Sequence, residues 1–212
     1  MLNRIRGAIF DLDGVIVDTA KYHYLAWKQL ADRRGIPFTE RDNERLKGVS
    51  RMRSLDIILE LGGLTVPDDE KEAMATLKNE LYLDYIRRMD ESEILPGAKA
   101  YMNGLRSKGV RIALGSASKN AAFILERVGL SGMFDAVIDG TKVSKAKPDP
   151  EVFLVACESL GLATRDCAVF EDAAAGVQAA KAAGIYVVGI GTADVLGEAD
   201  EVVAGLHELV YD

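Results

Sequence analysis

Two aspartates near the start of the chain, Asp11 and Asp13, are the residues whose type and spacing point most directly to chemistry. They follow an apolar run, residues 5–10, that predicts a buried strand. In extended backbone, residues two apart point to the same side, so the two carboxylates lie close together. Two such carboxylates remain ionised together only with a proton or a cation between them. The pair therefore predicts a site for a hard cation such as Mg²⁺, and a carboxylate able to attack a phosphoryl group.

Three structural alternatives explain the same aspartates without chemistry. Asp13-Gly14 is a strong two-residue turn signal, and the apolar residues 15–17 supply a partner strand for a hairpin. A lone aspartate also serves commonly as a helix N-cap or a turn residue. A calcium loop is excluded, because Val15 and Tyr22 stand where that loop needs oxygen ligands. The rest of the chain decides between a turn and a reactive pair.

The composition is that of an ordinary globular chain, with 212 residues, a net charge of −7, 49% hydrophobic and 28% charged residues. This length suffices for a large core with a smaller companion. The acidic balance, without a Lys/Arg cluster, argues against nucleic acid or an anionic membrane as a partner, and no apolar stretch reaches membrane-spanning length. Cys157 and Cys167 lack metal-ligand spacing, so we expect reduced structural thiols. A cytoplasmic monomer is the expected form.

Hydrophobic periodicity divides the chain into two parts. Residues 20–89 have helical spacing, and from residue 95 onward helices and strands alternate, which predicts a parallel sheet covered on both faces. The expected helices are 22–34, 42–47, 51–61, 68–88, 98–108, 119–128, 151–160 and 173–183, and the expected strands are 5–10, 110–115, 134–138, 167–170, 185–190 and 201–204. The predicted fold class is α/β: a doubly wound, Rossmann-like core (1–16 and 93–212) with an inserted all-helical cap (17–92).

Polar side chains follow three of the expected strands at the point where each strand ends. Asp11 ends the first strand, Ser116 ends the second and Glu171-Asp172 follows a later one. Ligands of doubly wound sheets bind at the carboxyl ends of the strands. This arrangement disfavours a hairpin at Asp13, because helices rather than an antiparallel strand come next. A shared site at the sheet edge is therefore expected.

Each member of this set has a physical task. Asp11, nearest the strand end, is the expected nucleophile. Glu171 and Asp172 complete an oxygen cage for Mg²⁺ with Asp11 and the backbone carbonyl of Asp13, whose side chain stays free as general acid and base. Ser116 is a neutral donor for a phosphoryl oxygen.

A lysine is expected to balance the negative charge of the carboxylate and the phosphoryl group. Lys147 is preferred over its neighbour Lys145 because it directly precedes Pro148. Taken singly, Lys147 could be a solvated loop charge, Ser116 a helix cap and Asp172 an N-cap. Their common position at strand ends makes coincidence improbable.

These motifs resemble those of the haloacid dehalogenase superfamily of phosphotransferases. Asp11-Leu12-Asp13-Gly14, Ser116, Lys147-Pro148 and Glu171-Asp172 match its four motifs in order, over essentially the whole chain. The helical insertion resembles the cap of one branch of that superfamily. Within the branch, residues 11–27, 46–51 and 116–120 resemble the β-phosphoglucomutase family. That resemblance implies a small-molecule sugar phosphate as partner. The implied reaction interconverts β-glucose 1-phosphate and glucose 6-phosphate through β-glucose 1,6-bisphosphate.

The resemblance also implies a second phosphate site, on the cap. Arg51 is its candidate, because a guanidinium binds phosphate oxygens through two donors. His23 and Trp27 share a helix face; His23 is expected to meet Asp13 and the sugar, and Trp27 to form the pocket wall, with core packing the competing interpretation. The other expected binding residues are Thr19, Gly48, Val49, Ser50, Ser54, Lys78, Ala117, Ser118, Lys119 and Asn120. For Lys78 a solvated position on the cap is nearly as well supported.

The main rival function is that of a phosphatase of the same superfamily, acting on a sugar phosphate or phosphoglycolate. It would use the same core and transfer the phosphoryl group to water, with no necessary role for Arg51. A phosphonate-cleaving relative lacks the second aspartate, Asp13. A signalling receiver also phosphorylates an aspartate at a strand end, but it has no helical insertion after the first strand.

Overall fold

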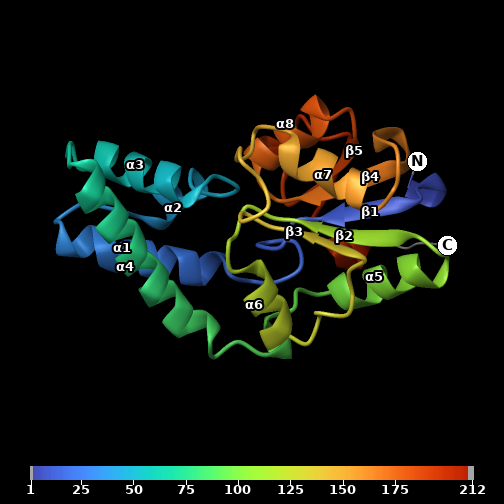
Figure 1. The fold of residues 1–212 in the computed structure, drawn as a ribbon, viewed down its shortest axis with the longest axis horizontal. Coiled ribbons are helices and arrows are strands. Elements are labelled where there is room, and N and C mark those ends of the chain that lie inside the picture. The colour runs from blue at the N-terminus through green and yellow to red at the C-terminus, as the bar shows by residue number, and fades with distance from the viewer. Residues whose placement is uncertain (1, 210–212) are drawn as a thin grey trace.

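The computed structural model describes residues 2–209 and has a six-stranded, fully parallel sheet with a separate group of helices at one end (Figure 1). The strand order is β3-β2-β1-β4-β5-β6. The strands are β1 (Gly7–Phe10), β2 (Arg111–Gly115), β3 (Ala136–Ile138), β4 (Cys167–Glu171), β5 (Tyr186–Ile190) and β6 (Glu201–Val203). Because β1 pairs with β2 on one side and β4 on the other, the connections diverge there. A ligand site is expected at such a switch point.

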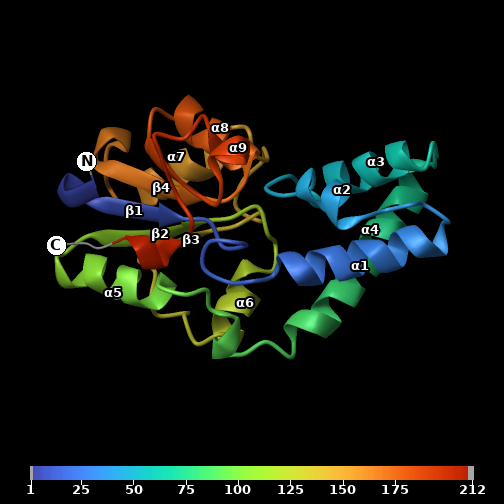
Figure 2. The same ribbon diagram turned by 180° about the vertical axis from the view of Figure 1, so that it is seen from behind.

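Helices cover both faces of the sheet. One face carries α5 (Ala98–Ser107) and α6 (Ala121–Arg127), and the other carries α7 (Glu151–Ser159), α8 (Ala174–Ala182) and the short α9 (Ala193–Leu196) (Figures 1 and 2). Strand β1 supplies both cores, because successive side chains alternate between faces. Phe10 joins the α5–α6 side, and Ile9 joins the α7–α8 side.

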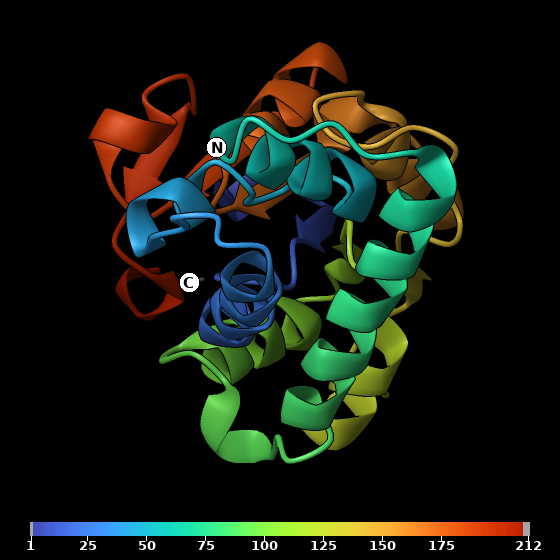
Figure 3. The ribbon, with the colours of Figure 1, turned by 90° about the vertical axis from the view of Figure 1, so that its left-hand side faces the viewer.

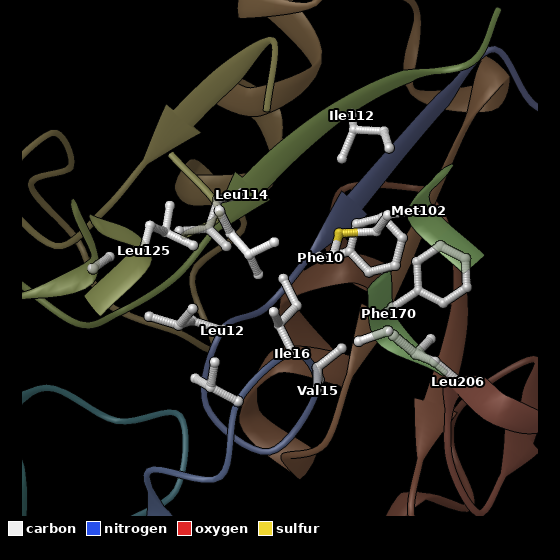
Figure 4. Close-up of a cluster of buried hydrophobic side chains, with 14 of the residues drawn as sticks. Phe10, Leu12, Val15, Ile16, Met102, Ile112, Leu114, Leu125, Phe170 and Leu206 are labelled. Carbon is white, nitrogen blue, oxygen red and sulfur yellow. The ribbon is translucent and has the colours of Figure 1, made fainter. Parts of the chain in front are cut away.

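The core on the α5–α6 side extends to the segment that follows β1. Leu12, Val15 and Ile16 are fully buried there and lie with Phe10 and Leu114 in one cluster (Figure 4). These apolar side chains anchor the segment on either side of the two aspartates. The hairpin alternative is thereby excluded, since residues 14–16 form a turn closed only by an isolated bridge between Asp13 and Val17, and a helix follows instead of a strand.

The helical group consists of α1 (Ala20–Arg33), α2 (Glu40–Glu44), α3 (Arg51–Leu61) and α4 (Asp68–Ile86). In Figure 3, where this group faces the viewer, its helices lie in front of the sheet. It has its own apolar core, in which Trp27, Leu55 and Ile58 are buried. Two chain segments join it to the sheet domain, and Asp18 N–H donates to the carbonyl of Glu93 between them at 2.9 Å. We call this helical group the cap.

The α/β fold class is confirmed, and the elements agree closely with those expected. β1 begins at Gly7 rather than at residue 5, α4 ends at Ile86, and α9 was not foreseen. In the described part of the chain, four short 3₁₀ segments complete the order: Leu2–Arg4, Glu91–Glu93, Thr164–Asp166 and Leu206–Glu208. The limits 1–16, 17–92 and 93–212 remain a prediction of where the domains divide. Within residues 2–209, no helix is long and apolar enough to cross a membrane.

Candidate active site

The polar residues expected at strand ends meet at the carboxyl edge of the sheet. Asp11 directly follows β1, Ser116 directly follows β2, and Glu171 is the last residue of β4. The N–H of Asp11 donates to the carbonyl of Phe170 at 2.9 Å, which continues the strand pairing to the nucleophile position. The central place of β1 therefore brings Asp11 between the other two.

Lys147 joins these strands by three hydrogen bonds. Its Nζ donates to Asp11 Oδ1 at 2.7 Å, to Glu171 Oε2 at 2.8 Å and to the carbonyl of Gly115 at 3.0 Å. Burial lowers the pKa of the amine, but the Asp11 and Glu171 carboxylates outweigh it and raise the pKa above its usual value. The lysine is thus a fixed positive charge beside Asp11. Lys145, by contrast, is exposed, and its Nζ lies 3.4 Å from Asp149 Oδ2.

Asp11, Glu171 and Asp172 form a cluster in which one carboxylate oxygen of each lies within 4.8 Å of the others. Burial raises the pKa of Glu171 to about 7, against the opposing effect of Lys147. Burial and the neighbouring Glu171 raise the pKa of Asp172. Crowded, buried carboxylates of this kind suit a divalent cation, which replaces the protons they otherwise take up.

Two glycines make room for this cluster. Gly14 has φ +79°, and a side chain there would collide with the Asp172 carboxylate. A side chain at Gly176, in the first turn of α8, would collide with the Glu171 carboxylate. Gly14 belongs to a motif visible in the sequence, whereas Gly176 stands in an alanine-rich helix where nothing distinguishes it.

Asp13 faces away from the carboxylate cluster, toward the cap. Its carboxylate accepts a hydrogen bond from the buried Thr19 hydroxyl and lies 3.9 Å from His23 Nε2. Burial, with a smaller contribution from Asp11, raises the pKa of Asp13 to about 6, and the Thr19 hydrogen bond opposes that rise. A carboxyl that titrates near neutrality is suited to both accepting and donating a proton.

A histidine and a lysine of the cap approach Asp13 from α1 and α4. His23 Nδ1 lies 2.8 Å from Lys78 Nζ, and the lysine amine sits 4.7 Å above the rings of both Trp27 and Tyr82. Burial lowers the pKa of Lys78 to about 7. Burial and the adjacent Lys78 lower the pKa of His23 well below its usual value. A solvated position for Lys78 is excluded, because its exposed fraction is 2%; Trp27 is both cap core and pocket wall.

The cap loop before α3 supplies the remaining cation. Gly48 has φ +71°, and Ser50 caps α3 by accepting a hydrogen bond from the N–H of Arg53 at 3.3 Å. Arg51, the first residue of the helix, donates from Nη2 to Asn79 Oδ1 at 2.8 Å. The loop and the helix start thus place a guanidinium beside Asn79 of α4.

A single cavity of about 290 Å³ connects the sheet edge with the cap. Of the expected site residues, the following line it: Asp11, Asp13, His23, Trp27, Gly48, Val49, Ser50, Arg51, Ser54, Lys78, Ser116, Ala117, Ser118, Lys119, Asn120, Lys147 and Asp172. Thr19 and Glu171 do not line the cavity; they are fully buried behind Asp13 and Lys147, to which they are bonded. The cavity therefore has an anionic, metal-suited end and a cationic end on the cap.

Lys47, which lines this cavity, and Tyr82, which is fully buried beside it, are among the residues that were missed in the sequence. Lys47 lies in the cap, and its Nζ is 3.8 Å from Asp172 Oδ2, so it links the cap to the carboxylate cluster. Tyr82 places its ring 4.1 Å from that of His23. Lys47 lies within residues 46–51, so the family resemblance of that segment could have found it. Tyr82 carries no signal of its own, since a tyrosine in a helix is an ordinary core residue.

Comparison with known proteins agrees with this geometry. Residues 5–184 match the family model of haloacid dehalogenase-like hydrolases. The chain belongs to this haloacid dehalogenase-like hydrolase family.

Within the family, the resemblance to β-phosphoglucomutases is confirmed. A β-phosphoglucomutase of Bacillus subtilis (strain 168) is 41% identical over 210 residues, covering 98% of this chain and 93% of that protein. A crystal structure of β-phosphoglucomutase from Clostridium difficile superposes with a TM-score of 0.93 at 42% identity, covering 98% of this chain and 94% of that one. A fructose-1-phosphate phosphatase of Escherichia coli (strain K12) is 33% identical over 190 residues, covering 90% of this chain and 98% of that protein.

Proposed function

We propose that the protein is a Mg²⁺-dependent β-phosphoglucomutase. It interconverts β-D-glucose 1-phosphate and glucose 6-phosphate through an aspartyl phosphate on Asp11 and β-glucose 1,6-bisphosphate. The similarity to two β-phosphoglucomutases over nearly the full chain supports this assignment. The geometry of the cavity supports it independently.

The observation that carries the proposal is that one cavity has groups suited to binding phosphate at both ends. Asp11, Lys147 and Ser116 line the end at the sheet, and Arg51 lines the end on the cap. A mutase that works through a bisphosphate has to hold one phosphate at the nucleophile and the other at the far end of the sugar. A monophosphate phosphatase needs only the first. The arginine of the cap is therefore the feature that favours a mutase.

In the first half-reaction, Asp11 Oδ attacks the phosphoryl group of the bisphosphate. A bond from Asp11 to phosphorus forms, the bond from phosphorus to the sugar oxygen breaks, and Asp13 donates its proton to that oxygen. Lys147, 2.7 Å from Asp11, balances the negative charge that gathers on the transferring group. The Ser116 hydroxyl is placed to donate to a phosphoryl oxygen.

In the second half-reaction, a sugar hydroxyl attacks the aspartyl phosphate and Asp13 takes up its proton. The pKa of about 6 allows Asp13 to exist in both forms near neutral pH. The hydrogen bond from Thr19 holds the carboxylate in place. His23, whose lowered pKa keeps it neutral, lies beside Asp13 without adding a competing charge.

Asp11, Glu171, Asp172 and the backbone carbonyl of Asp13 are the groups proposed to hold Mg²⁺. The three carboxylates fit such an ion because their oxygens converge within 4.8 Å and oxygen donors are what Mg²⁺ prefers. When bound, the ion neutralises negative charge on the transferring phosphoryl group. The cap, proposed to comprise residues 17–92, would exclude water from the aspartyl phosphate when it closes on the sheet domain.

We further propose that the enzyme acts as a cytoplasmic monomer on a small-molecule sugar phosphate, without nucleic acid or membrane as partner. The net charge of −7 disfavours polyanionic partners. Cys157 and Cys167 are both free and buried, as expected of thiols in a reducing compartment. Sedimentation at micromolar concentration should give the mass of one chain, and a dimer mass would contradict the monomer.

The alternative function is a sugar-phosphate or phosphoglycolate phosphatase, which the similarity to a fructose-1-phosphate phosphatase keeps open. One assay separates the two. The purified protein is given Mg²⁺, β-glucose 1-phosphate and a trace of β-glucose 1,6-bisphosphate, and glucose 6-phosphate and free phosphate are measured together. A mutase forms glucose 6-phosphate in large excess over phosphate. Release of phosphate without isomerised sugar would establish the phosphatase.

A further inference from the structure

Asn79, on the cap helix α4, joins two candidate phosphate-binding residues through a single oxygen atom. Its Oδ1 accepts a hydrogen bond from Arg51 Nη2 at 2.8 Å and another from Asn120 Nδ2 at 3.0 Å. Arg51 begins α3 of the cap, whereas Asn120 directly precedes α6 of the sheet domain. Asn79 of α4 is therefore bonded to the start of α3 in the cap and to the residue before α6 in the sheet domain.

The orientation of the Asn79 amide follows from its partners. A guanidinium can only donate hydrogen bonds, so the oxygen of the amide has to face Arg51. The NH₂ group then points the other way, and Asn79 lines the cavity shared by the cap and the sheet domain. The side chain therefore lies at the cavity with its oxygen bound to the two donors.

A neutral partner has a specific advantage for Arg51. An arginine side chain is long, and fixing it costs conformational entropy that its hydrogen bonds must offset. A carboxylate partner would fix it but would also neutralise its charge and repel a phosphate. Arg53, two residues later and exposed, has just such a partner, Glu60, at 2.9 Å. At Arg51 the amide oxygen of Asn79 fixes the guanidinium and leaves its positive charge available.

The Arg51 guanidinium is also partly desolvated. It is half-buried, and burial lowers its pKa from the usual value. A partly buried cation attracts an anion more strongly than an exposed one, because less water screens the pair. The position of the guanidinium therefore matters for the strength with which it binds a phosphate dianion.

We propose that Asn79 is a positioning residue for the far phosphate of the sugar bisphosphate. Its amide oxygen holds Arg51 of the cap and Asn120 of the sheet domain as one paired anion site, so that the bisphosphate is retained long enough to be turned over. This inference rests on the proposed mutase function. It adds a residue that acts through Arg51 and Asn120 and has no part in the chemistry at Asp11.

The test compares two phosphoryl donors in the variant Asn79→Leu, which keeps the size of the side chain but removes its hydrogen bonds. β-Glucose 1,6-bisphosphate has a far phosphate, and acetyl phosphate has none. We expect the KM for the bisphosphate to rise about tenfold or more, as for the loss of hydrogen bonds to a charged group. The rate of phosphorylation by acetyl phosphate should stay within about twofold of wild type, which also shows that the variant folds. Glu80→Gln, an exposed neighbour on the same helix, is the control and should alter neither.

A double-mutant cycle tests whether Asn79 acts through Arg51. In an Arg51→Ala background, Asn79→Leu should change the KM for the bisphosphate less than about threefold. The full tenfold effect in that background would overturn the inference, as would an unchanged KM in Asn79→Leu alone. Equal losses with both donors would show a general structural role and overturn it too. Should Asn79→Leu not fold, Asn79→Ser, which is too short to reach both donors, is judged by the same criteria.

Failure of this inference is distinguishable from failure of the proposed function. If the wild-type protein releases phosphate without isomerising the sugar, the proposed function fails. If the wild-type protein isomerises the sugar and Asn79→Leu has the wild-type KM, only the positioning role fails.

Discussion

Asp11 and Asp13 hold their carboxylates against different partners, although one residue separates them. Asp11 accepts a hydrogen bond from Lys147 at 2.7 Å within the sheet domain, and Asp13 accepts one from Thr19 at the base of the cap. The two side chains therefore experience different electrostatic surroundings. The structure thus supports dividing nucleophile and proton carrier between them.

This division predicts opposite outcomes for two variants. Asp11→Asn should abolish the phosphoenzyme with every donor. Asp13→Asn should still be phosphorylated by acetyl phosphate, because acetate leaves without needing a proton, but isomerisation should fall by on the order of 10²–10⁴. The phosphoenzyme is measured by acid-trapped label and the isomerisation by glucose 6-phosphate. Wild-type turnover in Asp13→Asn would refute its role in proton transfer.

Lys147 should be essential where its neighbour Lys145 is not. Lys147→Met removes the charge beside Asp11 and should slow phosphoenzyme formation by about 10²–10³, because charge on the transferring group is no longer balanced. Lys145→Met is the matched control, since Lys145 also lines the cavity but is exposed and pairs with Asp149 instead of Asp11. Single-turnover rates with acetyl phosphate compare the two. Equal effects of both substitutions would show that Lys147 has no special place.

The hydrogen bond from Thr19 to Asp13 should affect the pH at which turnover falls on the acidic side. With β-glucose 1-phosphate as acceptor and saturating Mg²⁺, Asp13 has to be ionised to take up the proton of the attacking sugar hydroxyl. Turnover is therefore expected to fall as the pH drops below about 6. The Thr19 hydrogen bond lowers the pKa of Asp13, so Thr19→Val should move this fall in turnover to higher pH. A fall that stays in place or moves to lower pH would contradict this assignment.

Lys78 should destabilise the folded protein in a pH-dependent way. Its pKa is about 7 in the folded state against the usual 10.5, so the folded state binds fewer protons between these values. The penalty is complete below pH 7 and fades toward pH 10.5. Lys78→Met should therefore raise the free energy of unfolding more at pH 6 than at pH 9, by about 3 kcal/mol.

Urea denaturation at the two pH values measures this difference. Lys71→Met is the control, since Lys71 lies on the same helix and pairs with Asp56 at 2.8 Å. It should not show the same pH dependence. A stability gain for Lys78→Met that is equal at both pH values would contradict the lowered pKa.

The sheet and its polar edge could be predicted because the evidence for them is local. Continuous apolar strands alternate with helices, and Asp11, Ser116 and Glu171 stand at strand ends in the printed sequence. The parallel topology then brings them together without further information. Lys147 could be chosen over Lys145 because Pro148 follows it.

The contacts between the cap and the sheet domain could not be predicted in this way. The burial of Lys78 against Trp27, the approach of Lys47 to Asp172 and the meeting of Arg51 and Asn120 at Asn79 all depend on how the cap is seated. Helical periodicity indicates which face of a helix is apolar but not which residue of another domain it meets. Polar residues that bridge domains therefore have no signal of their own in one sequence.

The account depends most directly on Arg51 as the second phosphate-binding end of the cavity. The decisive measurement is the ratio of glucose 6-phosphate to free phosphate formed from β-glucose 1-phosphate, bisphosphate and Mg²⁺. Arg51→Ala is compared with Arg53→Ala, an exposed arginine of the same helix. The ratio should fall about tenfold or more in Arg51→Ala, because a weakly held bisphosphate escapes and the aspartyl phosphate is left to water. It should be unchanged in Arg53→Ala. An unchanged ratio in Arg51→Ala would contradict a two-ended mutase site.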